Sequence, residues 1–225
     1  VLLQLLKTSG ITFPIKRIVD IGGGDAFVIN EIYKQNLAAS YFTIDTAYSP
    51  EIISQLKANY GENPIHYVQN LTDYFANFPS EENTLFLCMD VLEHLENENE
   101  ILNHLTEKNN YFLFAVPAFQ SVFSNHDVLL GHYRRYNLNQ LQQVLKQHNF
   151  QIQDKGYYFT SLLLMRWLES LFDKNKKASI DNWRGSAFKS KLITSVLQLD
   201  FGFTQVLKKF GIRIYGLSCY CICKK

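Results

Sequence analysis

The sequence predicts an α/β protein with a mainly parallel sheet, because three observations agree. Over residues 1–120, short β-branched or aromatic runs alternate with amphipathic stretches, which is typical of βαβ units. A glycine-rich turn joins the first of these runs to the first amphipathic stretch. The length of 225 residues is enough for one sizeable core, so we expect a single domain over residues 1–225.

The alternating segments set the order of the expected elements. Strands are expected at residues 17–21, 41–45, 65–69, 84–89 and 111–116. Helices are expected at residues 26–35, 50–60 and 98–108. In the first of these helices, Ile29, Ile32 and Tyr33 recur at helical spacing. The crossovers between parallel strands should be right-handed.

The pattern changes after Pro117, where a polar, aromatic and basic loop extends to Tyr136. Four further segments are expected: a helix at 138–147, a strand at 150–159, two amphipathic helices over about 160–210 around a polar link at 173–185, and a last strand at 215–223. We interpret residues 160–210 as a helical insertion before the last strand. Its apolar faces are either core or a lid for an apolar ligand.

Composition and charge exclude several classes of protein. Hydrophobic residues make up 47% and charged residues 19% of the chain, which excludes intrinsic disorder as the main state. With 22 Lys and Arg against 21 Asp and Glu, the net charge of +1 creates no field for nucleic acid, so no such partner is expected. The apolar runs fall short of the roughly 20 residues of a transmembrane helix. We expect a cytoplasmic protein, and peripheral membrane contact through residues 160–210 stays open.

The four cysteines indicate neither a metal site nor a disulfide framework. Cys219, Cys221 and Cys223 alternate in the expected last strand, whereas structural zinc sites usually place two to four residues between ligands. No second Cys or His pair completes a set of four ligands. We therefore expect buried apolar thiols, Cys88 included, in a reducing compartment, and no metal.

The strongest local feature is the run at residues 18–26, where an expected strand turns into an expected helix. Asp20 precedes three glycines at 22–24, and glycines at such a turn let the backbone approach a ligand closely. The dinucleotide pattern G-x-G-x-x-G fails, because Phe27 stands where the third glycine would be. A nicotinamide enzyme is therefore disfavoured.

This run resembles motif I of the class I S-adenosylmethionine-dependent methyltransferases. Asp20, Gly22 and Gly24 match that motif, Gly23 lies between the two glycines, and Ala26 replaces the usual third glycine. The resemblance extends over about residues 15–160 and the last strand. It implies a Rossmann-like seven-stranded sheet of order 3-2-1-4-5-7-6 in which only the last strand is antiparallel. It also implies S-adenosyl-L-methionine as cofactor and S-adenosyl-L-homocysteine as product.

Two later pairs of residues match places where the family binds its cofactor. Asp45, followed by Thr46, ends the second expected strand, where a carboxylate can accept both ribose hydroxyls. The alternative for Asp45 is a helix cap or a turn aspartate. Asn70 and Leu71 follow the third strand, where the family contacts the adenine ring, although Asn is also an ordinary turn residue.

The segment that closes the fourth strand resembles the D-V-L-E-H segment common in the small-molecule branch of the family. Ligands of open α/β sheets lie beyond the carboxyl ends of the strands, so Met89, Asp90 and His94 are expected at the cofactor. We interpret Glu93 as a first-turn carboxylate that satisfies the helix dipole.

The loop after the fifth strand resembles the H-D-x-x-x-G-H-x-R-R-Y loop of one bacterial-type methyltransferase subgroup, often found beside genes for glycan or lipid-carrier modification. Long polar loops at the carboxyl end of a sheet are more often functional than decorative. The residues expected to bind the acceptor are His126, Arg134, Arg135 and Tyr136. The candidate catalytic bases are His94, His126 and His132. The alternative is an internal network of hydrogen bonds and ion pairs that only shapes the loop.

The resemblance implies transfer of a methyl group to oxygen or nitrogen of a small-molecule, glycan or lipid-linked acceptor. Two alternatives stay open: a non-catalytic cofactor-binding scaffold, and an NAD or nucleotide-sugar enzyme of the Rossmann type. Turnover of the cofactor to S-adenosyl-L-homocysteine separates an enzyme from a scaffold. The sequence leaves the acceptor and the oligomeric state open.

Overall fold

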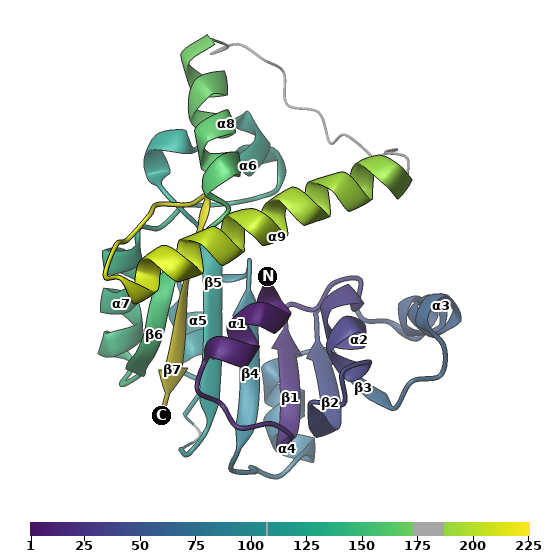
Figure 1. Ribbon diagram of the computed structural model, residues 1–225. Helices are drawn as coiled ribbons and strands as arrows, with labels where there is room; N and C mark the ends of the chain where they lie inside the picture. Colours follow the sequence, from purple (N-terminus) through teal and green to yellow (C-terminus); the bar gives the residue numbers. More distant parts are fainter. Residues whose placement is uncertain (107, 173–186) are drawn as a thin grey trace.

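Seven strands form one sheet in the computed structural model, which describes residues 1–106, 108–172 and 187–225, without the side chains of 169–172 and 187–192 (Figure 1). Their order is β3-β2-β1-β4-β5-β7-β6. β7 is antiparallel to both of its neighbours, and the other pairs are parallel. The strands are β1 (Ile15–Ile21), β2 (Ala38–Ile44), β3 (Ile65–Val68), β4 (Thr84–Met89), β5 (Tyr111–Pro117), β6 (Gln151–Tyr158) and β7 (Ser218–Lys224). The fold expected from the sequence is thereby confirmed.

Helices cover both faces of this sheet. The helices are α1 (Leu2–Thr8), α2 (Phe27–Tyr33), α3 (Pro50–Tyr60), α4 (Leu71–Asn77), α5 (Asn99–Leu102), α6 (Asn125–Leu129), α7 (Leu138–Gln147), α8 (Thr160–Phe172) and α9 (Ala187–Lys209), with 3-10 turns η1 (Leu92–His94) and η2 (Gln120–Val122). One hydrophobic core lies under α1, α2, α3 and α9, and the other lies under α4, α5 and α7. The architecture is therefore a three-layer α/β/α sandwich.

The sequence does not predict α1, α4 or α6. α4 begins directly behind β3, where the Asn70 side chain caps it by accepting a hydrogen bond from the Asp73 amide at 2.8 Å. Aromatic residues within α4 obscure its helical periodicity. The helix expected at 98–108 shortens to α5, because Asn and Thr, which favour caps and turns, follow it.

The helical insertion between β6 and β7 is anchored to the rest of the fold. Phe201 and Thr204 of α9 are buried, and Phe201 belongs to the same core as α1. Asp200 of α9 accepts hydrogen bonds from the backbone amide and the hydroxyl of Ser161 in α8, at 3.0 and 2.8 Å. Lys208 donates to Tyr220 of β7 at 2.8 Å. Part of α9 is therefore core; the link expected at 173–185 lies outside the described residues.

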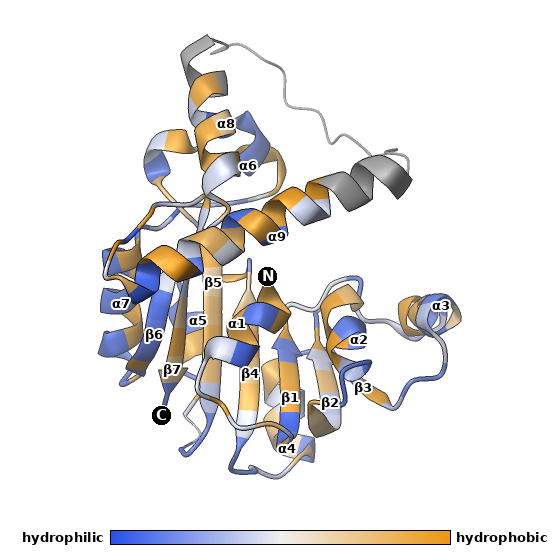
Figure 2. Cartoon of the chain, viewed as in Figure 1, coloured by the Kyte–Doolittle hydropathy of each residue, from blue (hydrophilic) through white to orange (hydrophobic). Residues whose placement is uncertain are grey.

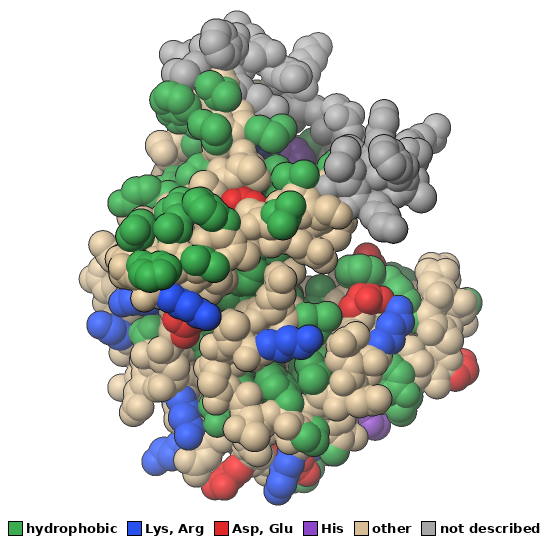
Figure 3. Space-filling model, in the orientation of Figure 1, with side chains coloured by type: hydrophobic (Ala, Val, Ile, Leu, Met, Phe, Trp, Pro, Cys, Tyr) green, Lys and Arg blue, Asp and Glu red, His purple; other side chains and the backbone are tan. Residues whose placement is uncertain are grey.

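The outer faces of α8 and α9 carry exposed apolar side chains, and both helices lie near the end of the sheet at which β5 finishes (Figures 1, 2 and 3). These side chains are Leu164, Met165, Trp167, Leu168, Ile193, Val196, Leu199, Phe203 and Val206. In the described ranges, each helix is too short or too polar to cross a bilayer. The insertion thus has a buried inner side and an apolar outer side.

All four cysteines are buried free thiols. Cys219, Cys221 and Cys223 belong to one core cluster together with Cys88, because alternate residues of β7 point to the same side of the sheet. Their expected burial is confirmed.

Candidate active site

The glycine loop at the carboxyl end of β1 packs closely against β2. The amides of Gly22 and Gly23 donate hydrogen bonds to the carbonyl oxygen of Ile44 at 2.8 and 3.1 Å. A Cβ atom on Gly23 would lie 1.9 Å from the Thr43 hydroxyl, so only glycine fits there. Gly24 has a φ of +50° and no heavy atom within 4 Å of the position its Cβ would take. The loop is therefore rigid on its inner side and open at Gly24.

Asp45, at the end of β2, is held by two backbone amides. Its Oδ2 accepts a hydrogen bond from the Gly24 amide, and its Oδ1 accepts one from the Ala47 amide, both at 2.9 Å. Each carboxylate oxygen keeps acceptor capacity beyond that bond. The side chain is thereby oriented to accept two neighbouring hydroxyls, and Thr46 is exposed beside it.

Asp20, one strand away, is a buried acid with an unsatisfied oxygen. The residue is 3% exposed, and no described residue donates to its Oδ2. Burial, followed by the charges of Asp25 and Asp45, raises the pKa of Asp20 to about 7. A cationic ligand group at this position would stabilise the ionised form.

The other residues expected at the cofactor follow β3 and β4. Asn70 is occupied as the cap of α4, since it also donates to the Asp73 carboxylate at 2.8 Å, and Leu71 is buried. Met89 is half-buried, and the exposed Asp90 has a left-handed φ of +52°. The adenine role of Asn70 and Leu71 stays a prediction.

The histidine loop and η1 meet although they are far apart in sequence. The rings of His94 and His132 lie edge to face, with centroids 4.6 Å apart. Next to them, the Tyr133 amide donates to the Glu93 carbonyl oxygen at 2.8 Å. Of the three candidate bases, the structure thus brings two into contact; His126 lies half-buried in α6.

Asp127 is the centre of a buried network in this loop. Its Oδ1 accepts from Arg135 Nε at 2.7 Å and lies 3.1 Å from His132 Nδ1. Its Oδ2 accepts from the Ser124 amide and hydroxyl at 2.9 and 3.1 Å. Burial alone would raise the pKa of Asp127, but the hydrogen bond and charge of Arg135 hold it below the ordinary value. Asp127 is therefore a carboxylate that fixes both neighbours.

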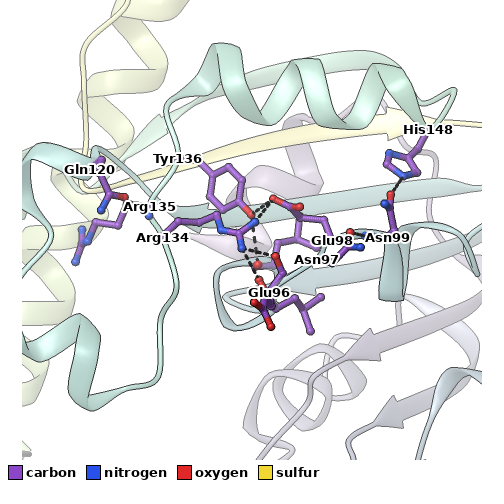
Figure 4. A network of polar contacts seen from close by, with 11 residues as sticks. Glu96, Asn97, Glu98, Asn99, Gln120, Arg134, Arg135, Tyr136 and His148 are labelled. Atoms are coloured by element: carbon purple, nitrogen blue, oxygen red, sulfur yellow. Dashed lines mark hydrogen bonds and ion pairs between the residues drawn. The ribbon is translucent and has the colours of Figure 1, made fainter.

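The neighbouring cations and Tyr136 have partners within the protein (Figure 4). Arg134 donates to Glu98 at 2.7 Å and to the carbonyls of Leu95 and Glu96 at 3.0 and 2.5 Å. The Tyr136 hydroxyl also donates to Glu98, at 2.7 Å. Arg134 and Arg135 point in opposite directions. The role of Arg134, Arg135 and Tyr136 in acceptor binding stays a prediction, and these contacts are those of a loop-shaping network.

Comparison with known proteins places this geometry in context. No family model and no curated protein matches the sequence. A candidate methyltransferase of Bacillus halodurans superposes with a TM-score of 0.59 at 15% identity, covering 100% of this chain and 98% of that chain. A SAM-dependent methyltransferase of Archaeoglobus fulgidus gives a TM-score of 0.54 at 17% identity, over 99% and 92% of the chains. The fold is that of the class I methyltransferases.

A third methyltransferase structure of this fold was solved with the cofactor. Phosphoethanolamine N-methyltransferase 2 of Haemonchus contortus, in complex with S-adenosyl-L-methionine, gives a TM-score of 0.57 at 15% identity. The match covers 99% of this chain and 51% of that chain. At this level of identity the similarity concerns the methyltransferase fold.

Glu93 was not identified from the sequence as a candidate site residue. It lies in the three-residue turn η1, is fully buried, and neither of its carboxylate oxygens has a partner among the described residues. Burial, followed by the charge of Asp90, raises the pKa of Glu93 to about 8. Glu93 does lie in the first turn of η1, but a turn of three residues has little dipole, so the expected stabilisation by a helix dipole does not account for this buried carboxylate.

Proposed function

We propose that the protein is an S-adenosyl-L-methionine-dependent methyltransferase that acts on oxygen or nitrogen of a small-molecule, glycan or lipid-linked acceptor. The observation that carries the proposal is one arrangement at the carboxyl edge of a methyltransferase-type sheet. There the loop is open at Gly24, the Asp45 carboxylate is fixed beside it, and Asp20 has an unsatisfied oxygen. Each feature matches one part of the cofactor. The open backbone at Gly24 allows close contact with the amino-acid part, the Asp45 carboxylate suits the ribose diol, and the unsatisfied oxygen of Asp20 suits the amino group.

The proposed cofactor contacts come from the ends of four strands, β1 to β4. The backbone of the glycine loop and Asp20 hold the amino-acid part, and Asp45 with Thr46 holds the ribose. The residues proposed to line the rest are Asn70, Leu71, Met89, Asp90 and His94. When bound, the cofactor supplies a methyl group on a sulfonium, which is already a good leaving group. The protein then mainly provides orientation and exclusion of water.

The acceptor side of the site is the region of the histidine loop and η1. Residues there would orient the acceptor so that its lone pair could form the new bond to the methyl carbon, with the electrons of the broken C–S bond staying on sulfur. A histidine, from His94, His126 or His132, takes the acceptor's proton, because histidine is the side chain that can do so near neutral pH.

The exposed apolar faces of α8 and α9 favour an acceptor with an apolar part. Large contiguous apolar surfaces usually mark binding sites. The exposed Lys209 at the end of α9 adds positive charge next to this surface, whereas Lys208 is paired with Asp154. We therefore favour the lipid-linked class, which would also account for peripheral membrane contact by a protein of the cytoplasm.

The dinucleotide alternative is disfavoured by the sheet itself. Dinucleotide-binding folds have the order 3-2-1-4-5-6, whereas here an antiparallel β7 is inserted between β5 and β6. The functional test is calorimetric titration with S-adenosyl-L-homocysteine and with NADH in parallel. We expect binding of S-adenosyl-L-homocysteine alone. Binding of NADH instead would overturn the proposal, and cofactor binding without turnover against glycan and lipid extracts would favour a scaffold.

A further inference from the structure

We propose that Glu93, His94 and His132 form a binding site for one divalent transition-metal ion. The existence of the site does not depend on the proposed function; its catalytic role, described below, rests on that function. This proposal departs from the sequence-based expectation of no metal, which rested on the spacing of the cysteines and on the lack of a second Cys or His pair in the sequence.

The geometry brings three ligand atoms of suitable chemistry together. One carboxylate oxygen or ring nitrogen from each residue lies within 4.8 Å of those of the other two. Two imidazoles and a carboxylate are a ligand set for zinc and other first-row divalent ions, and not for Ca²⁺ or Mg²⁺, which prefer oxygen alone. Ligands of one such ion lie about 3 Å apart, so the side chains need to close by roughly 1–2 Å. His94 is exposed and has room to move.

The buried Glu93 carboxylate is the second, independent observation. Both of its oxygens lack a partner among the described residues, and a buried carboxylate without compensation is costly. The nearby cation, Arg135, is used by Asp127 and by the carbonyl of Ala118. A metal ion would supply the missing positive charge.

The ring of His132 is oriented by a hydrogen bond to a carboxylate, as metal-binding histidines usually are. Because Asp127 is a carboxylate that also accepts from Arg135, the 3.1 Å contact makes His132 Nδ1 the donor. In the neutral ring, Nε2 then carries no proton and is able to bind an ion. A carboxylate behind the ligand histidine is the usual arrangement in metal sites.

Three protein ligands would leave at least one coordination position open to a further ligand. A divalent ion there would attract the acceptor's oxygen and lower its pKa, which favours attack on the methyl carbon. His94 and His132 would then act as ligands, and His126, the remaining candidate base, would take the acceptor's proton.

The test measures metal binding directly on the tag-free chain. Co²⁺ is the spectroscopic probe, because its visible absorption reports nitrogen and oxygen ligation, and Zn²⁺ uptake is measured by equilibrium dialysis. We compare the parent with Glu93→Gln, His132→Gln and the matched control His104→Gln, which changes an exposed histidine outside the cluster. We expect one ion per chain in the parent and control, and affinity weaker by roughly tenfold to 100-fold in the two site variants.

Folding of the variants is controlled within the same experiment. Gln has nearly the same shape as Glu and replaces a buried side chain that has no partner among the described residues, so Glu93→Gln should melt close to the temperature of the metal-free parent. Zn²⁺ should raise the melting temperature of the parent and of His104→Gln, and at the same concentration should raise that of Glu93→Gln much less.

Two results would overturn the metal site: no uptake of Co²⁺ or Zn²⁺ by the parent, or equal affinity in the parent and both site variants. The second result would mean that the ion binds elsewhere. Titration of S-adenosyl-L-homocysteine on the metal-free chain is the separate test of the proposed function. Metal uptake without cofactor binding would remove the methyltransferase proposal and leave the site, and the reverse result would remove only the site.

Discussion

The backbone amide of Gly24 donates a 2.9 Å hydrogen bond to Oδ2 of Asp45, so a side chain at the end of β2 fixes the loop at the end of β1. The bond also fixes the carboxylate, whose other oxygen accepts from Ala47. Two cofactor contacts assigned separately from the sequence are therefore parts of one rigid unit, because moving either strand end would break the bond.

Replacing Asp45 should weaken cofactor binding. Asp45→Ala removes a charged acceptor for the ribose hydroxyls and the anchor of Gly24, so we expect binding of S-adenosyl-L-homocysteine to weaken by about 1.5–3 kcal/mol. Calorimetric titration measures it. The matched control is Asp25→Asn, which removes a negative charge from the exposed part of the same loop and should have a much smaller effect. Equal losses in the two variants would mean that only net charge matters.

Asp20 should make stability depend on pH. Its pKa in the folded protein is about 7, above that of the unfolded chain, so its contribution is fully present below about pH 4 and is lost as the pH rises towards 7. Asp20→Asn cannot lose a proton. The free energy of unfolding of this variant should therefore rise relative to the parent between pH 4 and 7, by a few kcal/mol at most, and then stay level. Urea unfolding across this range tests it; a constant difference would contradict the assignment.

Adjacent arginines should differ sharply in their effect on stability. Arg135→Met leaves Asp127 as a buried charge without its ion-pair partner, and we expect a loss of about 3–5 kcal/mol. Arg134→Met breaks a partly exposed pair with Glu98 and should cost about 1 kcal/mol. Denaturant unfolding measures both. The double variant Arg135→Met with Asp127→Asn should recover part of the loss, and no recovery would mean that the arginine acts through packing alone.

The apolar outer face of α9 should bind lipid surfaces. Leu199 and Phe203 are 75% and 61% exposed, so Leu199→Ser with Phe203→Ser should leave the melting temperature nearly unchanged. Co-sedimentation with anionic phospholipid vesicles should decrease several-fold, because apolar insertion supplies part of the binding energy. Ile52→Ser, on α3, is the control for loss of an exposed apolar residue. Equal vesicle binding in all three proteins would remove the membrane-facing interpretation.

Much of the fold could be predicted because its signals are local. The periodicities of strands and helices depend on neighbouring residues, and so do the glycines at a strand-to-helix turn. The strand order came from the resemblance of that turn to one family. The insertion was predicted as either core or lid. The structure shows that part of it is core, since Phe201 is buried, while Phe203, two residues later on the helix, is exposed; the role as a lid stays a prediction.

The candidate site was harder to predict because it depends on contacts distant in sequence. No local pattern pairs the ring of His94 with that of His132, and the burial of Glu93 arises in a turn of three residues, too short to have a period. Arg134 and Arg135 have the same chemistry in sequence but different surroundings in space. Asn70 presents a different difficulty. The same side chain can cap a helix or contact an adenine ring, so the residue type alone does not distinguish the two roles.

The pairing of Tyr158 with Ser218 means that the chain leaves the sheet for the insertion and returns to it at adjacent points. Because β6 and β7 are antiparallel, a short turn could close the same gap, and the intervening residues can change in length or composition without altering the register of any strand. In evolution, such a segment can be exchanged while the strands that hold Asp20 and Asp45 are inherited intact. One cofactor scaffold can thus acquire new acceptors by replacing a single continuous piece of chain.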